Sequence, residues 1–172
     1  MDYKHIMLDL ETLSTKGDAA ILSIGAVVFD LKNKLIGDSF YNTINLQDCI
    51  DLKLRIDAST FYWWINQSEI ARQKICDHPI NMNLALLNFT SFCKKHLDEN
   101  FEIWSKGQSF DISILKNAYQ SSKLPYPWNY RNERDVRTYI RDLDKEFHVY
   151  DYENSHDPVS DCIDQIKTMF MV

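Results

Sequence analysis

Glycine, proline and paired cysteines are scarce in this sequence, and each scarcity excludes a class of structure. Only 4 glycines and 4 prolines occur among 172 residues, which argues against a flexible linker or a low-complexity segment. No C-x-x-C pair is present, so neither a zinc site nor a disulfide framework is indicated. We therefore expect reduced, mostly buried thiols at the 4 cysteines, which are Cys49, Cys76, Cys93 and Cys162.

Long apolar runs and an excess of basic charge are also missing. No stretch approaches the ~20 apolar residues of a membrane span, and the N-terminal MDYKHIMLDLE carries carboxylates where a signal peptide would be apolar. We therefore expect a cytoplasmic protein without a membrane partner. The formal net charge of −6 argues against a protein that coats nucleic acid through a broad basic face. It does not exclude a nuclease that grips a few terminal nucleotides, because bound divalent ions can supply the positive charge.

The hydrophobic residues are numerous enough for one buried core. With 45% hydrophobic residues, the 172 residues fit a single domain, 1–172, and are too few for two comfortable ones. The segments 3–10, 21–29 and 35–44 are apolar or loosely alternating runs typical of strands. The polar turn Lys32-Asn33-Lys34 joins the last two as a hairpin. The start of the chain is therefore predicted to be an antiparallel three-strand meander.

The remaining chain alternates between helical and extended patterns. Ser59-Thr60 is a candidate N-cap for the first helical run, and a short strand is expected at 101–104. Helices are expected at 61–75, 84–97, 112–120, 135–145 and from Asp157-Pro158 onward. The pattern predicts an α/β domain with a mixed central sheet flanked by helices.

Two acidic residues, Asp9 and Glu11, lie at the end of the first expected strand. Since side chains alternate along a strand, both carboxylates point to one face and repel each other unless a cation lies between them. Magnesium and manganese prefer oxygen ligands, and two such ions can hold the attacking water and the leaving oxygen of a phosphodiester. A D-x-E pair is also common at solvated strand ends, so the motif by itself leaves both interpretations open.

Two further segments place acidic residues at the beginnings of helices. Asp111 follows the turn Lys106-Gly107 after the short strand, and Asp161 lies about one turn inside the last helix. His156 precedes that helix and could face the same side as Asp161. Ordinary structural explanations also exist: Asp111 as an acid favoured by the helix dipole, Asp157 as a cap, and His156 as a solvated histidine.

Taken in order, the D-x-E, F-D and H-x-x-x-x-D motifs resemble the DEDDh branch of the DnaQ-like 3′–5′ exonucleases. The flanking sequence is similar too, because a hydrophobic-D-x-E-T followed by LSIGAVVFD looks like the first motif and second strand of that superfamily. The segments 59–67 and 134–138 resemble signatures of the phage exonuclease A and exonuclease VIII-like group. The resemblance covers nearly the whole chain and implies a ribonuclease H-like fold.

This resemblance implies a role for each residue of the motifs. Two divalent cations, Mg²⁺ or Mn²⁺, would be bound by the four acidic residues, which are Asp9, Glu11, Asp111 and Asp161. His156 would be the general base that deprotonates the attacking water, since histidine titrates near neutral pH. In the family, the segment after the first motif contacts the terminal nucleotide, which points to Thr12 and Leu13. Phe110 would pack near the base or the sugar.

Aromatic and basic residues near the motifs leave alternatives open. Either Trp63 or Trp64 could stack on an unpaired base. Adjacent helical positions point ~100° apart, so we expect only one of them, Trp64, to face the site. Arg134 and Arg137 could contact phosphate, or could instead pair with local acids.

Two positions depart from the family pattern, in which a small residue such as alanine is frequent. These positions are Pro158 and Cys162, and neither change removes a ligand. Proline is acceptable in the first turn of a helix, but Pro158 could alter the angle at which His156 is presented. Few residues follow Asp161, so no separate substrate-binding domain is expected after it.

The predicted function is a metal-dependent exonuclease acting on the 3′ end of single-stranded DNA or RNA, with DNA favoured by the resemblance to the phage group. One alternative is an oligoribonuclease-like hydrolase of very short oligonucleotides, which shares the same five residues. Another is a non-catalytic nucleic-acid-binding module of the same fold, against which the five filled positions argue. The sequence leaves the oligomeric state open, a homodimer included.

Overall fold

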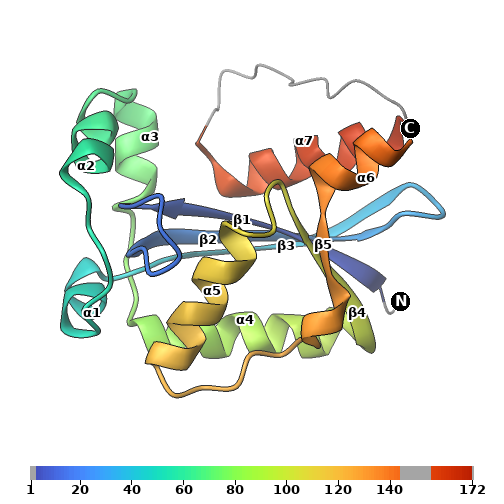
Figure 1. The fold of residues 1–172 in the computed structure, drawn as a ribbon, viewed down its shortest axis with the longest axis horizontal. Coiled ribbons are helices and arrows are strands. Elements are labelled where there is room, and N and C mark those ends of the chain that lie inside the picture. Colours follow the sequence, from blue (N-terminus) through green and yellow to red (C-terminus); the bar gives the residue numbers. More distant parts are fainter. Residues whose placement is uncertain (1–2, 144–155, 172) are drawn as a thin grey trace.

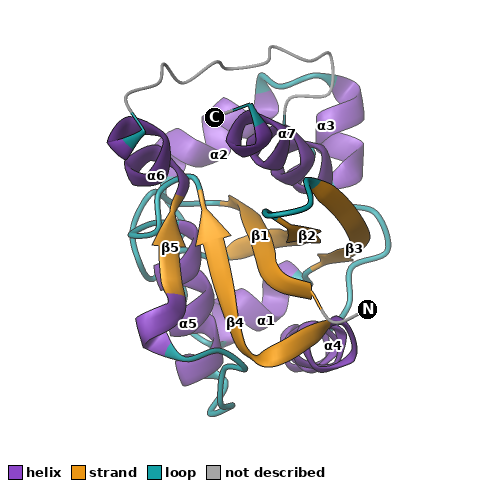
Figure 2. Ribbon diagram, turned by 90° about the vertical axis from the view of Figure 1, so that its right-hand side faces the viewer, coloured by secondary structure: helices purple, strands orange, loops and turns teal. Residues whose placement is uncertain are grey.

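A five-stranded mixed sheet forms the centre of the protein, whose computed structural model describes residues 3–143 and 156–171. The strands are β1 (Tyr3–Thr12), β2 (Ile21–Asp30), β3 (Leu35–Thr43), β4 (Leu97–Ser105) and β5 (Glu133–Asp135). Their order across the sheet is β3-β2-β1-β4-β5 (Figure 2). The first three strands pair antiparallel, whereas β4 runs parallel to β1 and β5 parallel to β4. The predicted meander and mixed sheet are confirmed.

Helices cover both faces of this sheet and one end of it (Figure 1). The helices are α1 (Leu46–Asp51), α2 (Ala58–Ile65), α3 (Glu69–Lys74), α4 (Met82–His96), α5 (Asp111–Ser121), α6 (Val136–Asp142) and α7 (Pro158–Phe170), with a 3₁₀ turn at Tyr130–Asn132. α4 and α5 lie on one face, α6 and α7 on the other, and each pair encloses a separate hydrophobic core. Within the described ranges, every helix is too short or too polar to cross a bilayer.

Strand β1 contributes to both cores and then to a polar site. Ile6 and Leu8 belong to the core beside α4 and α5, whereas Met7 belongs to the core beneath α6 and α7. Because side chains alternate along a strand, Asp9 and Glu11 share the face of Met7. The strand therefore delivers two carboxylates to the side of the sheet that α7 covers.

The first turn of α7 lies directly on β2. A Cβ atom at Gly25 would come within 2.5 Å of the Cβ of Pro158, so only glycine permits this approach. The thiol of Cys162 lies 3.5 Å from the carbonyl oxygen of Met7 and 3.7 Å from that of Gly25. Both departures from the family pattern, Pro158 and Cys162, thus belong to the contact that seats α7 on the sheet.

We expect Gly25→Ala to lower the free energy of unfolding by about 1–3 kcal/mol, because overpacking forces the backbone to shift. The added carbon would meet the backbone of Pro158 and Val159 at 2.7 and 2.9 Å. Urea denaturation measures the change. Gly17→Ala is the matched control, since nothing lies within 4 Å of a Cβ atom there. Equal stability of the two variants would contradict the close contact between α7 and β2.

The helical run expected over 61–75 is interrupted in the structure, and its predicted start was wrong. α2 ends at Ile65, and α3 begins after Ser68, whose hydroxyl accepts a hydrogen bond from the Ala71 N–H and caps the new helix. The predicted cap, Ser59-Thr60, lies inside the first turn of α2, and Asp57 occupies the cap position.

Three other differences concern short or terminal segments. Helix α6 spans Val136–Asp142 after its cap Asp135, and residues 144–145 of the predicted helix lie outside the described ranges. Helix α1 and strand β5 were not predicted from the sequence. The three residues of β5, Glu133–Asp135, are all charged, so they carry no apolar alternation that would indicate a strand.

Candidate active site

Three carboxylates meet where α7 packs over β1. One oxygen each of Asp9, Glu11 and Asp161 lies within 4.8 Å of the other two. Asp9 and Glu11 come from the last part of β1, and Asp161 comes from the first turn of α7. Glu11 is 8% exposed, and the other two are partly buried. Residues far apart in the sequence therefore form one acidic group.

Asp111 joins this group from the beginning of α5. Its Oδ1 accepts a hydrogen bond from the N–H of Leu10 at 3.2 Å, and the residue is 4% exposed. The turn that leads from β4 into α5 contains Gly107 at a φ of 117°, a conformation that favours glycine. The charge of Asp111 helps to raise the pKa of both Asp9 and Glu11, so the four carboxylates interact electrostatically.

Burial raises the pKa of all four carboxyl groups above the ordinary range. The pKa rises to about 8 at Glu11, to about 7 at Asp111 and to about 6 at Asp161, and burial is the largest cause in each case. Burial also raises the pKa of Asp9 well above its usual value, with further contributions from the charges of Asp111, Glu11 and Asp161. Without cations, this cluster is therefore costly to ionise.

Among the described residues, two basic side chains lower the pKa of carboxyl groups in this cluster of four. The charge of Lys106 lowers the pKa of Asp161, and the charge of Arg137 lowers the pKa of Asp111. Arg137 is exposed, and the ammonium of Lys106 is itself partly desolvated, which lowers its pKa. Bound divalent cations would supply the missing positive charge.

A buried glutamine, Gln165, completes the polar surroundings. Its Nε2 donates a hydrogen bond to Oδ1 of Asp9 at 3.0 Å, while its Oε1 finds no donor among the described residues. Carboxylate and amide oxygens are the ligands that Mg²⁺ and Mn²⁺ prefer, so the donor set fits such ions. The sequence-based interpretation missed Gln165, whose one signal is its place a helical turn after Asp161.

In the presence of a chelator, we expect the protein to lose stability as the pH rises from about 4 to about 8, because the pKa of Glu11 is raised to about 8 and that of Asp111 to about 7. In this window the folded protein binds more protons than the unfolded chain, so the free energy of unfolding falls as the pH increases. Melting temperatures at several pH values measure the effect.

Glu11→Gln should flatten this pH dependence, since an amide does not ionise. Glu99→Gln is the matched control, because it makes the same change at an exposed glutamate in β4. A melting temperature that stays constant or rises across the window would contradict the raised pKa values.

His156 immediately precedes α7 in an unusual backbone conformation, with a φ of 76°. Its backbone N–H lowers the pKa of Asp161 through a hydrogen bond, which links the histidine to the carboxylate cluster. Burial lowers the pKa of the imidazole below its usual value. The ring is therefore neutral near pH 7 and able to accept a proton.

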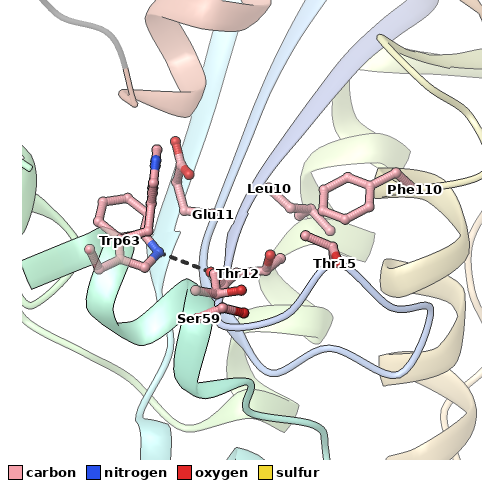
Figure 3. A pocket seen from close by; sticks show the side chains of 9 residues that line it. Leu10, Glu11, Thr12, Thr15, Ser59, Trp63 and Phe110 are labelled. Carbon is pink, nitrogen blue, oxygen red and sulfur yellow. Dashed lines mark hydrogen bonds between the residues drawn. The ribbon is translucent and has the colours of Figure 1, made fainter.

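A pocket of about 390 Å³ opens beside Glu11 (Figure 3). Figure 3 shows Leu10 and Phe110 on one side of it and Trp63 with Glu11 on the other. The pocket is lined by Leu10, Glu11, Thr12, Thr15, Ser59, Thr60, Trp63, Trp64 and Phe110. Three of the four residues predicted to contact the nucleotide line this pocket: Thr12, Trp64 and Phe110. The fourth, Leu13, does not line it, because it is 4% exposed and packs in the core.

The two tryptophans of α2 both line this pocket but differ in exposure. Trp64 is 4% exposed, and its Nε1 donates to the carbonyl oxygen of Thr12 at 2.9 Å, drawn as the dashed line in Figure 3. Trp63 is 43% exposed. The expectation that only Trp64 faces the site therefore overlooked Trp63, since both side chains line the pocket.

The two arginines near β5 differ in their partners. The Nη2 of Arg134 lies 2.6 Å from Oε1 of Glu102, so this guanidinium is paired with a local acid. The Nη1 of Arg137 lies 3.5 Å from the position that a Cβ atom at Gly107 would take, on the turn that leads to Asp111. Arg137 is thus the arginine that borders the carboxylate cluster.

Two sequence comparisons point to nucleases. A family model described as a 3'-5' exoribonuclease Rv2179c-like domain matches residues 4–172. An Enterobacteria phage T4 protein named exodeoxyribonuclease is 26% identical over 162 residues, which are 80% of this chain and 70% of that protein.

Two solved structures share the fold. The nuclease domain of 3'hExo, a DEDDh family member bound to rAMP, has a TM-score of 0.62 at 13% identity, over 99% of this chain and 93% of that one. The E. coli ExoI–ssDNA complex has a TM-score of 0.70 at 14% identity, over 100% of this chain and 40% of that one. At these identities the similarity concerns the fold alone, and it confirms the predicted ribonuclease H-like architecture.

Proposed function

The chain belongs to the 3'-5' exoribonuclease Rv2179c-like family, and we propose that this 3′–5′ exonuclease acts on single-stranded nucleic acid with two bound divalent cations. The observation that carries the proposal is the meeting of Asp9, Glu11 and Asp161 within 4.8 Å, with Asp111 beside them. Glu11 and Asp111 are buried, Asp9 and Asp161 are partly buried, and a cluster of carboxyl groups with raised pKa values is typical of functional sites.

The four carboxylates would hold the cations, and the donor set described above suits them. When bound, two such ions supply Lewis-acid stabilisation of the attacking and leaving oxygens. Gln165 keeps the Asp9 carboxylate in place through its hydrogen bond of 3.0 Å. The chain's own contribution is therefore a fixed arrangement of oxygen ligands on β1, α5 and α7.

His156 would act as the general base. Its lowered pKa leaves the imidazole neutral at pH 7, so it can take a proton from the water that attacks the terminal phosphorus. The bond from phosphorus to the 3′ oxygen of the preceding nucleotide breaks, and a nucleoside 5′-monophosphate leaves. The pocket beside Glu11 has a volume of about 390 Å³ and aromatic walls, which suit a single terminal nucleoside.

Whether the enzyme prefers DNA or RNA is a separate question. The family description names an exoribonuclease, whereas the phage relative is named an exodeoxyribonuclease. We propose that single-stranded 3′ ends are the substrate class and that DNA is favoured. Discrimination between the two depends on contacts to the 2′-hydroxyl.

A gel time course with 5′-labelled single-stranded DNA and RNA of equal sequence tests this proposal. We expect a ladder that shortens from the 3′ end with manganese and is absent with chelator. A dinucleotide and a blunt duplex, run in parallel, rank chain length and strandedness. Intact oligonucleotides with cleaved dinucleotides would replace the proposal with hydrolysis of very short oligonucleotides, and no cleavage at all would overturn it.

We expect Arg137→Ala to raise KM for an oligonucleotide about 10-fold with little change in kcat, because hydrogen bonds to charged groups contribute roughly 1.5–3 kcal/mol. Arg134→Ala is the matched control, since its guanidinium is already paired with Glu102. Steady-state kinetics at two salt concentrations measure the effect, which should shrink at high salt. Equal effects of both substitutions would contradict the distinction between the two arginines.

A further inference from the structure

We propose that Trp63 is a positioning residue for His156, and that it links occupation of the nucleotide pocket to the placement of the general base. This inference rests on the proposed function, in which the imidazole takes the proton of the attacking water. Trp63 is suited to the role because it touches both the pocket and the histidine.

The imidazole of His156 lies against two indole rings. Its centroid is 4.7 Å from that of Trp63, at an interplanar angle of 84°, and 6.0 Å from that of Trp64, at 74°. The two indoles are themselves perpendicular, with centroids 5.0 Å apart and an angle of 82°. Such edge-to-face arrangements are favourable because the positive edge of one ring meets the negative face of another.

The backbone alone does not explain the position of the imidazole. At a φ of 76°, His156 occupies the left-handed region that residues other than glycine rarely adopt. Such conformations persist where surrounding contacts hold them, and they are frequent at active sites. For the described part of the chain, the ring contacts recorded at His156 are those with Trp63 and Trp64, so the aromatic group is the support that the structure offers.

Of the two indole rings that contact His156, that of Trp64 is fixed in place and that of Trp63 is partly exposed to solvent. Trp64 is buried and fixed to the carbonyl oxygen of Thr12 in β1, and Trp63 packs against it. Trp63 is 43% exposed and lines the pocket. A nucleotide that contacts this free surface restrains the indole, and the imidazole that packs on the indole is restrained with it.

Three variants on α2 test the proposal. We expect Trp63→Leu to lower kcat by about 100-fold, since a misplacement of about 1 Å costs that much. Trp63→Phe keeps an aromatic ring against the imidazole and should retain most of kcat. Phe61→Leu is the matched control, because Phe61 is 48% exposed on the same helix and contacts Tyr62 instead of His156. Equal kcat values for Trp63→Leu and Phe61→Leu would overturn the proposal.

A double-mutant cycle separates positioning from simple substrate binding. If Trp63 acts through His156, Trp63→Leu should lower kcat in the wild-type background and leave it unchanged in a His156→Ala background. A change in KM common to both backgrounds reports the contact of Trp63 with the nucleotide. The same loss of kcat in both backgrounds would overturn the positioning role. If His156→Ala itself leaves kcat unchanged, the general-base assignment fails instead.

Proton NMR of the metal-free protein gives a readout that needs no activity. The ring protons of His156, assigned by their loss in His156→Ala, lie within the ring-current field of Trp63. We expect Trp63→Leu to shift these signals and Phe61→Leu to leave them in place. Unshifted signals in Trp63→Leu would show that the indole does not hold the imidazole, whatever the kinetics.

Discussion

Asp9→Asn is expected to lower kcat/KM by about 1,000-fold, because the cations that this carboxylate would hold under the proposed function would stabilise the transition state by several kcal/mol. Asp9 is central to the cluster: its pKa responds to the charges of Asp111, Glu11 and Asp161. The asparagine is of similar size and retains an oxygen for the hydrogen bond from Gln165. The loss should therefore reflect charge rather than packing.

Two measurements of melting temperature accompany this variant. Saturating magnesium should raise the melting temperature of the wild type by mass action and raise that of Asp9→Asn much less. In chelator at pH 8, the variant should melt at a higher temperature than the wild type, because one repelling buried carboxylate is gone. Glu99→Gln, at an exposed glutamate, serves as the control for both. An unchanged response to magnesium would refute the assignment of Asp9 as a ligand.

His156→Ala is expected to lower kcat by about 10²–10⁴-fold, the usual contribution of a positioned general base. Metal binding should persist, because the four carboxylates that would hold the cations lie on β1, α5 and α7 and remain intact. The magnesium-induced rise in melting temperature should thus match that of the wild type. A lower kcat with an unchanged response to magnesium distinguishes a general base from a metal ligand, since Asp9→Asn should lose both the activity and the response to magnesium.

The pH dependence of kcat/KM gives a second test of His156. Burial lowers the pKa of the imidazole, so the wild-type rate should stay high down to a pH below 6.5 and then fall as the base becomes protonated. The variant should lack this fall. His78→Ala is the control, because the His78 side chain is 94% exposed. An identical pH profile in His156→Ala would exclude the imidazole as the base.

The parts of the site that follow from local periodicity were predictable. Alternation along β1 required Asp9 and Glu11 to share a face, and the glycine turn after β4 indicated that Asp111 begins a helix. The meander followed from three apolar runs and one polar turn. The order of the motifs then supplied the fold through the family resemblance, because spacing alone does not say which helix lies over which strand.

The unpredicted features depend on tertiary contacts. Leu13 packs in the core, and its N–H donates a hydrogen bond to the carbonyl oxygen of Ala20, a residue beyond the following loop. Gln165 reaches Asp9 only after α7 docks, and its place a helical turn after Asp161 is the one sign of this in the sequence. The left-handed backbone of His156 and the exposure of Trp63 are likewise set by neighbours distant in the sequence.

The contact between α7 and Gly25 has a consequence for protein synthesis. Gln165 and Asp9 are 156 positions apart, and α7 is the last element that the ribosome makes among those described. The carboxylates of β1 therefore emerge long before Asp161 and His156 exist to complete the site. A chain that stops before α7 has Asp9 and Glu11 but lacks Asp161 and His156, so under the proposed function it has neither the full set of ligands nor the base.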